Sequence, residues 1–270
     1  MLRLTALYSG SKGNSYLIEC GDSVVLVDAG RSARAITTAL AAAGVSPDKL
    51  SAVLLTHEHT DHVSALRVLS SKGDFPIYAA APVLDAVCAT DEIYARAYTV
   101  RPGEAFVLGD LTVSSCAVPH DSAACLAYRF TDNDGACIAI ATDMGRVTNE
   151  TAALCAGCSG VVLESNHDPD MLRLGSYPAQ LKARILSGRG HLSNGQCADF
   201  AAWLAESGTT AFALAHLSRE NNTPSLATDA ARQALDAAGH ADAALCAIGE
   251  CGGIRMVADG SGARIVPCGE

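Results

Sequence analysis

The sequence predicts a mixed α/β fold in which two β-sheets pack face to face with helices on the outside. Three observations support this prediction. Short strands joined by Gly-rich turns open the chain, wholly apolar strands follow in the middle, and strands alternate with helices in the last third. Since no internal repeat or Pro/Ser-rich linker divides the 270 residues, we expect one domain over residues 1–270.

The N-terminal third is expected to begin with three strands, at 2–8, 15–20 and 23–30, separated by the turns "SGSKGNS" and "CGDS". A helix follows at 32–44, with Ser32 as its N-cap and Gly44 as its end. The run "AVLLT" at 52–56 lacks polar alternation, which is typical of a strand buried on both faces. A further helix is predicted over 63–73.

The rest of the chain continues with strands and then with alternating strands and helices. The middle strands are expected at 75–80, 105–109, 111–118, 125–131 and 137–142. In the last third we expect strands at 160–164 and 210–215 and helices at 178–187, 195–208 and 225–239.

The bulk composition indicates a globular protein of a reducing compartment. No apolar run approaches the roughly 20 residues that cross a bilayer, and the N-terminus lacks a signal-peptide pattern, so we expect a cytoplasmic location. The eleven cysteines lie mostly in apolar stretches, as small buried side chains do, and Cys155 and Cys158 are left open between a structural and a metal or redox role. The net charge of −10 disfavours broad non-specific attraction to nucleic acid.

The segment "HEHTDH" at 57–62 concentrates four potential metal ligands directly after a buried strand. His57 and His59 are two residues apart and point to the same side if the chain stays extended. Asp61 and His62 then stand at the entry to the next helix. This mixture of nitrogen and oxygen donors suits zinc and also fits manganese or iron.

Further donors lie at the ends of other predicted strands. His120 follows "AVP", Asp143 follows "IAIAT", and His216 follows "FALA". Because ligand sites in layered α/β folds collect beyond the carboxyl ends of strands, we expect these side chains to meet. Asp28, at the end of "VVLV", is expected to brace the metal loop from behind.

This set of motifs resembles the metallo-β-lactamase-fold hydrolases, and the resemblance covers nearly the whole chain. It implies a four-layer αββα sandwich and a site for two divalent metal ions. One metal would be held by His57, His59 and His120, the other by Asp61, His62 and His216, with Asp143 bridging. Zn²⁺ is the first expectation, with Mn²⁺ or iron as alternatives. True β-lactamases of this fold lack the bridging aspartate, so its presence points to the phosphodiesterase and thioester-hydrolase branches.

Within this superfamily "SGSKGNSYLI", "ESNHD", "GHLSN" and "HLSRENNTP" look like the YycJ/WalJ-type bacterial metallohydrolases. "GHLSNG" also resembles the catalytic-histidine motif of the tRNA 3′-processing endonucleases. This implies that His191 is a general acid charged through Glu164, while the second "HLS" carries the ligand His216. Asp61 would orient or deprotonate the attacking water as well as bind metal.

The leading hypothesis is therefore a nuclease or phosphodiesterase, DNA exonuclease-like, with nucleic acid as substrate and no membrane partner. The alternative is a hydrolase of small molecules such as a cyclic nucleotide, another phosphodiester, a lactone or a thioester, which the negative charge suits better. DNA or RNA, the direction of attack and the oligomeric state stay open. Polar side chains near the two "HLS" motifs are expected to contact substrate, although such residues also form turns: His167, Ser193, Asn194, Ser218 and Asn222.

Overall fold

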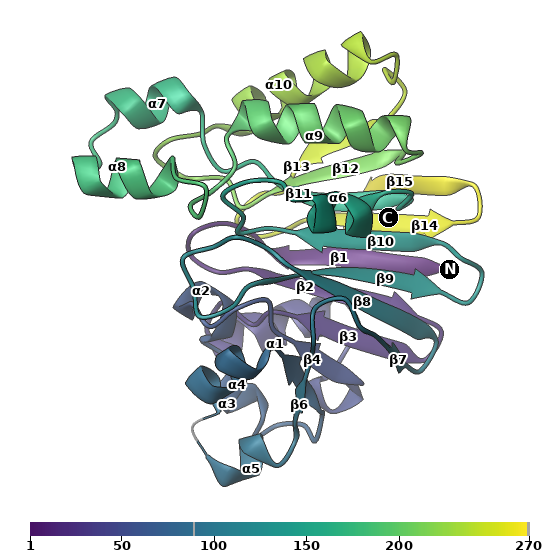
Figure 1. The fold of residues 1–270 in the computed structure, drawn as a ribbon. Helices are drawn as coiled ribbons and strands as arrows, with labels where there is room; N and C mark the ends of the chain where they lie inside the picture. The colour runs from purple at the N-terminus through teal and green to yellow at the C-terminus, as the bar shows by residue number, and fades with distance from the viewer. Residues whose placement is uncertain (89, 269–270) are drawn as a thin grey trace.

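Two mixed β-sheets lie face to face in the computed structural model, which describes residues 1–88 and 90–268 (Figure 1). The first sheet has the order β15-β14-β1-β2-β3-β4-β5-β6 and the second β13-β12-β11-β10-β9-β8-β7. The first sheet comprises β1 (Leu2–Tyr8), β2 (Ser15–Cys20), β3 (Ser23–Val27), β4 (Ala52–Leu54), β5 (Ile77–Ala79), β6 (Ala97–Thr99), β14 (Ile254–Asp259) and β15 (Gly262–Pro267). The second comprises β7 (Ala105–Leu108), β8 (Leu111–Ala117), β9 (Leu126–Asp132), β10 (Cys137–Ala141), β11 (Gly160–Glu164), β12 (Ala211–Ala215) and β13 (Ala244–Ala247).

Each sheet combines antiparallel hairpins with a parallel half. Strands β14, β15, β1, β2 and β3 pair antiparallel, whereas β3 to β6 pair parallel. In the second sheet β7 to β10 are antiparallel and β10 to β13 parallel. The parallel strands need crossovers, and helices supply most of them. Polar residues that follow parallel strands therefore gather at one edge of the sandwich.

Helices cover the outer faces of the sandwich, as predicted. α1 (Ala33–Ala42), α2 (Thr60–Val63), α3 (Leu66–Leu69), α4 (Ala81–Val87) and α5 (Asp91–Tyr94) lie beside the first sheet, and a short 3₁₀ turn spans Pro47–Lys49. α6 (Asn149–Cys155), α9 (Asn194–Glu206) and α10 (Pro224–Ala237) cover the second sheet, while α7 (Pro169–Leu174) and α8 (Ala179–Ile185) project from the sandwich (Figure 1).

Two apolar cores hold these four layers together. The larger fills the space between the sheets, with Leu4 and Ile138, and continues between the first sheet and its helices, with Leu26 and Leu40; all four are fully buried. The smaller lies between the second sheet and its helices and includes Leu163 and Leu204. The αββα arrangement thus buries both faces of the central parallel strands, which explains why every residue of β4, β10, β11 and β12 is buried.

The helix predicted over 63–73 is wrong, because two four-residue helices, α2 and α3, occupy this region. Asp61 O accepts from Asn14 N at 2.8 Å instead of from the amide four residues on. That amide, Ala65 N, donates to Ala29 O at 2.9 Å. Tertiary hydrogen bonds thus replace helical ones and fix the histidine motif against the loop after β3.

Candidate metal centre

The predicted ligands converge at the edge of the sandwich where strands of both sheets end. His57, His59 and His62 follow β4 of the first sheet, whereas His120 and His216 follow β8 and β12 of the second. Among the described residues other than glycine, positive φ angles occur at Asp28, Asp143 and His216 (60°, 57° and 58°). All three follow a strand directly or after one residue. Such conformations cost free energy and persist only where the surrounding structure enforces them.

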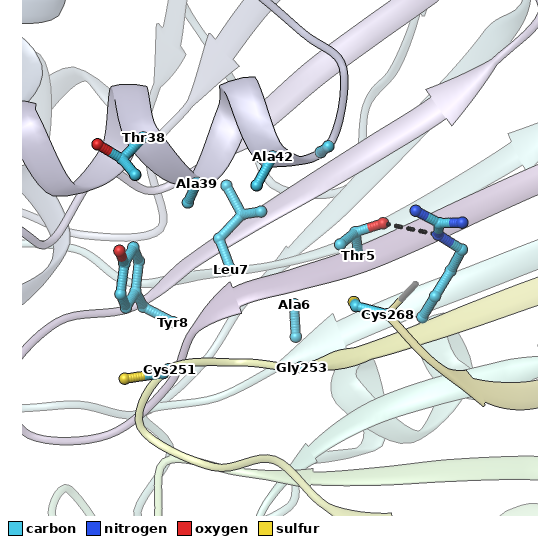
Figure 2. A pocket seen from close by; sticks show the side chains of 12 residues that line it. Thr5, Ala6, Leu7, Tyr8, Thr38, Ala39, Ala42, Cys251, Gly253 and Cys268 are labelled. Atoms are coloured by element: carbon cyan, nitrogen blue, oxygen red, sulfur yellow. Dashed lines mark hydrogen bonds between the residues drawn. The ribbon is translucent and has the colours of Figure 1, made fainter. Parts of the chain in front are cut away.

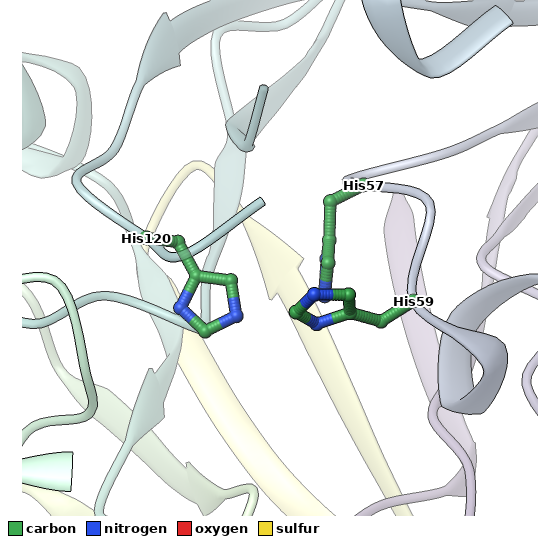
Figure 3. A group of neighbouring side chains, drawn as sticks. All are labelled: His57, His59 and His120. Atoms are coloured by element: carbon green, nitrogen blue, oxygen red, sulfur yellow. The ribbon is translucent and has the colours of Figure 1, made fainter. Parts of the chain in front are cut away.

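One group consists of His57, His59 and His120, whose imidazoles face a common point (Figure 3). One nitrogen of each lies within 4.8 Å of the corresponding nitrogens of the others. His57 is fully buried, and its Nε2 has no hydrogen-bond partner among the described residues. Burial and the neighbouring His62 lower the pKa of His57, so its ring is neutral and offers a lone pair.

A second group consists of Asp61, His62 and His216. Asp61 Oδ2 lies 3.6 Å from His62 Nε2 and 3.7 Å from His216 Nε2. Burial alone would raise the pKa of Asp61, but the neighbouring His216 and His62 outweigh it and hold the pKa of this carboxyl below its ordinary value. The three side chains therefore present two nitrogens and one carboxylate to the same space.

Asp143 stands between the two groups. It forms a third cluster with His57 and His62, one residue from each group. Its side chain is buried, Oδ2 lies 3.5 Å from His62 Nε2, and Oδ2 accepts no hydrogen bond from the described residues. Although burial opposes ionisation, His216 and His62 keep the pKa of Asp143 well below its ordinary value. A buried, ionised carboxylate with a free oxygen is a donor that needs a cation.

The histidines are oriented from behind. In four of the five, His57, His62, His120 and His216, Nδ1 faces a protein acceptor, which leaves Nε2 for the cluster, as in metal-ligating histidines generally. The acceptors are Thr56 Oγ1 for His57, Asp28 Oδ2 for His62, Gly190 O for His120 and Glu164 Oε1 for His216, at 3.0, 2.7, 3.3 and 2.9 Å. The predicted brace by Asp28 is present, and its carboxylate also accepts from Thr56 N at 2.8 Å.

Asn14 is a further brace that the sequence reasoning missed. It is fully buried, and its Nδ2 lies 3.0 Å from His62 Nε2 and 3.4 Å from Asp61 Oδ2. The neighbouring loops fit tightly, since a Cβ on Gly30 would lie 1.6 Å from Asp61 O and 2.7 Å from Asn14 N. The quoted stretch "SGSKGNSYLI" contains Asn14, but nothing in its local pattern distinguishes a brace from a turn residue.

The Glu164–His191 pair lies beside these groups. Glu164 is fully buried at the end of β11, and its Oε1 is 2.7 Å from His191 Nδ1. The same oxygen is 2.9 Å from His216 Nδ1, so Glu164 contacts the histidines of both "HLS" copies. Met144 N and Leu192 N donate to Oε2 at 2.9 and 3.2 Å. Burial would raise the pKa of Glu164, but His191 and His216 lower it to about 2.

These side chains fit divalent cations. Buried donor atoms without hydrogen-bond partners in the described chain include His57 Nε2, His216 Nε2 and Asp143 Oδ2, and all three point into the clusters. Orphaned buried polar atoms are rare unless water or an ion satisfies them. Donor atoms of Asp143, Glu164, His191 and His216 also lie within 4.8 Å of one another. In this fourth group, however, both histidines contact Glu164 through hydrogen bonds of Nδ1.

A pocket of about 250 Å³ opens over the clusters and is lined by His59, Asp61, His120, Asp143, His191 and His216. Its opposite wall comes from α8 and the turn before it, through Tyr177, Leu181 and Arg184. Arg184 pairs with Asp121 at 3.2 Å, and Asp121 Oδ1 lies 3.3 Å from His120 Nε2. The sequence predicts a helix over 178–187 but not this position, because a helical pattern does not show which part of the fold the helix faces.

Of the residues expected to contact substrate, Ser218 lines this pocket. The Ser193 side chain caps α9 in a capping box with Gln196. Asn194 and Asn222 hydrogen-bond each other at 2.8 and 2.9 Å. His167 is 1% exposed and is not among the residues that line the pocket. In the structure the side chains of Ser193, Asn194 and Asn222 thus support the loops, whereas both ring nitrogens of His167 lack a hydrogen-bond partner among the described residues. The substrate role of the set stays a prediction.

Another hollow, of about 530 Å³, lies between α1 and the first sheet (Figure 2). Thr5, Tyr8, Cys251 and Cys268 line it, and none of the predicted site residues does so. Cys155 and Cys158 are buried free thiols in the smaller core. Within the described ranges, no helix is both long and apolar enough to cross a membrane.

Comparison with known proteins places this geometry in context. A family model described as "Beta-lactamase superfamily domain" matches residues 23–217. The exodeoxyribonuclease WalJ of Streptococcus pneumoniae is 36% identical over 229 residues, which are 83% of this chain and 85% of WalJ. The exodeoxyribonuclease YycJ of Bacillus anthracis is 36% identical over 244 residues, 88% of this chain and 90% of YycJ. The crystal structure of the metallo-β-lactamase-fold protein YhfI from Bacillus subtilis superposes with a TM-score of 0.69 at 20% identity, covering 93% of this chain and 97% of YhfI.

Proposed function

This chain belongs to the metallo-β-lactamase-fold superfamily, in its YycJ-like branch, and on that premise we propose that it is a DNA exonuclease dependent on two divalent metal ions. It is a hydrolase that acts on phosphodiester bonds and requires divalent metal. The finer assignments, namely DNA as substrate, attack from a chain end, two ions and the roles of single residues, are the proposal.

The observation that carries the proposal is the pair of three-ligand groups with Asp143 between them. His57, His59 and His120 would hold one ion, and Asp61, His62 and His216 the other. Asp143 lies in reach of both groups and would bridge. The mixed imidazole and carboxylate donors favour Zn²⁺ and are compatible with Mn²⁺ or iron. When bound, two such cations neutralise phosphate charge and lower the pKa of a coordinated water.

Asp61 would orient the attacking water. Its side chain is 28% exposed and lines the pocket, whereas Asp143 is 2% exposed. Asn14 and the two histidines engage Oδ2, so Oδ1 is the oxygen that faces the pocket for a water hydrogen bond. Because the pKa of Asp61 is lowered, its carboxylate accepts the hydrogen bond that points the water's lone pair at phosphorus.

His191 would supply the proton to the leaving oxygen. Its ring is 15% exposed, lines the pocket, and has Nδ1 held by Glu164, so Nε2 faces the substrate space. The Glu164 carboxylate orients the ring, so that Nε2 is the nitrogen from which the leaving oxygen would take its proton. That proton would be replaced from solvent through the open side of the pocket.

End-labelled oligonucleotides test the proposal most directly. With Zn²⁺ or Mn²⁺ we expect single nucleotides to accumulate from linear DNA and a covalently closed circle to resist degradation. Asp143→Ala should abolish both activity and full metal loading, which elemental analysis of the purified protein measures. Cleavage of circles, or a preference for RNA over DNA by more than tenfold, would contradict the exonuclease assignment while leaving the phosphodiesterase activity in place.

A second candidate is a hydrolase of small phosphodiesters. The pocket volume of about 250 Å³ favours it, since that space is below the roughly 300–1,000 Å³ typical of ligand pockets and accommodates little more than one nucleotide. The net charge of −10 is also unfavourable for long polyanions. If kcat/KM for a cyclic mononucleotide exceeds that for a tenmer under the same conditions, this candidate replaces the exonuclease.

A further inference from the structure

A second pocket, of about 370 Å³, adjoins the metal centre and shares His120 with it. Three loops build most of it: the segment after β8, the segment after β10 and the segment before α9. We call it the arginine pocket, because Arg146 and Arg189 lie on its wall. None of the described residues that line it is acidic, whereas Asp61, Asp121 and Asp143 line the pocket over the metal ligands.

The three loops are locked together. Gly145 N donates to Pro119 O at 2.9 Å, and a Cβ on Gly145 would lie 2.3 Å from both Gly188 C and Arg189 N. The loop after β8 is also tied to the histidine motif, because Ala123 N donates to Glu58 Oε1 at 2.7 Å. Side chains on these loops therefore have a fixed position relative to the metal ligands.

Arg189 is anchored to the backbone of a candidate metal ligand. Its Nε and Nη2 donate to His120 O at 3.1 and 2.9 Å, which leaves both Nη1 protons and one Nη2 proton unused. Arg146 Nη1 donates to Gly188 O at 3.4 Å and keeps its other donors. Neither guanidinium forms an ion pair within the described chain, so both charges remain available to an anion.

The remainder of the arginine pocket is apolar. Ala80, Pro102, Val118 and Leu126 contribute to its wall. Single-stranded nucleic acid is commonly held by cations along the backbone and by apolar or aromatic surfaces under the bases. The arginine pocket offers both features next to His120, where the scissile phosphate would lie.

We propose that the arginine pocket binds the nucleotide next to the scissile phosphodiester, with Arg146 and Arg189 on its phosphate and the apolar wall against its sugar and base. This inference rests on the proposed phosphodiesterase function. The site selects polynucleotides over substrates with a single phosphodiester, because a mononucleotide ester has no second phosphate to place there. Phosphate contacts of this kind position the strand without reading its sequence.

Two substrates separate the subsite from the catalytic centre: bis(p-nitrophenyl) phosphate, with one phosphodiester, and a single-stranded oligothymidylate tenmer. For Arg146→Ala and Arg189→Ala we expect kcat/KM on the tenmer to fall about 10- to 100-fold, as for loss of a hydrogen bond to a charged group. Turnover of bis(p-nitrophenyl) phosphate and metal content should stay within twofold of the unmodified protein. The slope of log(kcat/KM) against log[salt] should become shallower by about one for each arginine.

Arg264→Ala is the matched control, since Arg264, on β15, carries the same charge in an exposed ion pair with Asp259 at the end of β14. It should alter neither substrate's turnover. Equal losses on both substrates would overturn the proposal and assign the arginines to support of His120, and unchanged tenmer turnover would overturn it too. If the unmodified protein cleaves neither substrate, the proposed function itself fails, which is a different result from failure of the subsite.

Discussion

At the residue scale, Glu164 differs most from its expected role. The sequence resemblance pairs it with His191 alone, yet its Oε1 contacts both His191 and His216. One buried carboxylate thus orients a candidate metal ligand and polarises the candidate general acid. Metal loading and proton transfer are therefore coupled through a single oxygen, and substitutions can separate the two effects.

The two "HLS" histidines should respond differently to truncation. His191→Ala should leave both metals bound and slow cleavage of a DNA oligonucleotide about 10²- to 10⁴-fold, the usual loss for general-acid catalysis. The defect should shrink on a p-nitrophenyl ester, since that leaving group needs little protonation. His216→Ala should lower metal content and impair both substrates. Elemental analysis with rates on both substrates checks this, and metal loss in His191→Ala would reverse the two assignments.

Glu164→Gln should combine both defects. Without the carboxylate, His191 loses the acceptor that orients its ring, and the tautomer of His216 is no longer enforced. We expect metal affinity to fall about 10- to 100-fold, as for other partners of metal-bound histidines, together with the leaving-group dependence of His191→Ala. Asp28→Asn is the control, because it removes the brace of His62 without touching His191. Competition with a chromophoric chelator measures affinity; wild-type affinity in Glu164→Gln would exclude the dual role.

At the element scale, the ends of strands carry the site and the loops beyond them hold it in register. The position of His57 after β4, or of Asp143 after β10, is readable from apolar runs that stop at a polar residue. The broken helix after the histidine motif is not, because Ala65 N bonds to Ala29 O, 36 residues earlier in the chain. Local pattern cannot anticipate a competing acceptor from another loop.

Substitution of Gly145 tests how much the contacts between these loops contribute to stability and to activity. Gly145→Ala should lower the free energy of unfolding by about 1–3 kcal/mol, because its Cβ meets the backbone of Gly188 and Arg189. The displaced loop carries His191, so cleavage should slow as well. Gly195→Ala, in the first turn of α9 with nothing within 4 Å of its Cβ, should instead add about 0.5–1 kcal/mol. Urea unfolding measures the free energy of unfolding of both variants. Equal values would show that the loops around Gly145 move to accommodate the added Cβ.

At the scale of the whole molecule, the ligands come from both sheets. His57, His59, Asp61 and His62 belong to the first sheet's loops, whereas His120, Asp143 and His216 belong to the second. The sequence predicted this sandwich and most of its strands, yet it missed β6, β13, β14 and β15. Strand β14 pairs with β1 at the other end of the chain, and exposed positions in β15 weaken its apolar signal.

Metal should consequently stabilise the assembly of the two sheets. Ligand present at 100 times its dissociation constant adds about 2.7 kcal/mol per independent site. We expect the melting temperature to fall on treatment with a chelator and to recover with Zn²⁺ or Mn²⁺. Asp143→Ala should show a smaller shift than the unmodified protein. A melting temperature that changes with neither chelator nor added metal would contradict a metal centre that holds the two sheets together.

The left-handed backbone at Asp28, Asp143 and His216 has a consequence for how this family can change. Glycine or asparagine adopts that conformation at lower cost, so each of these positions gives up folding free energy for a side chain that would bind metal or, at Asp28, brace a metal ligand. Selection of random variants for heat resistance alone should therefore enrich glycine or asparagine there. Descendants of such a gene would keep the sandwich and lose the chemistry, and His216→Gly should unfold at higher denaturant than His216→Ala when both are free of metal. In a duplicated copy of the gene, these three positions would therefore be the first at which stabilising substitutions remove the activity.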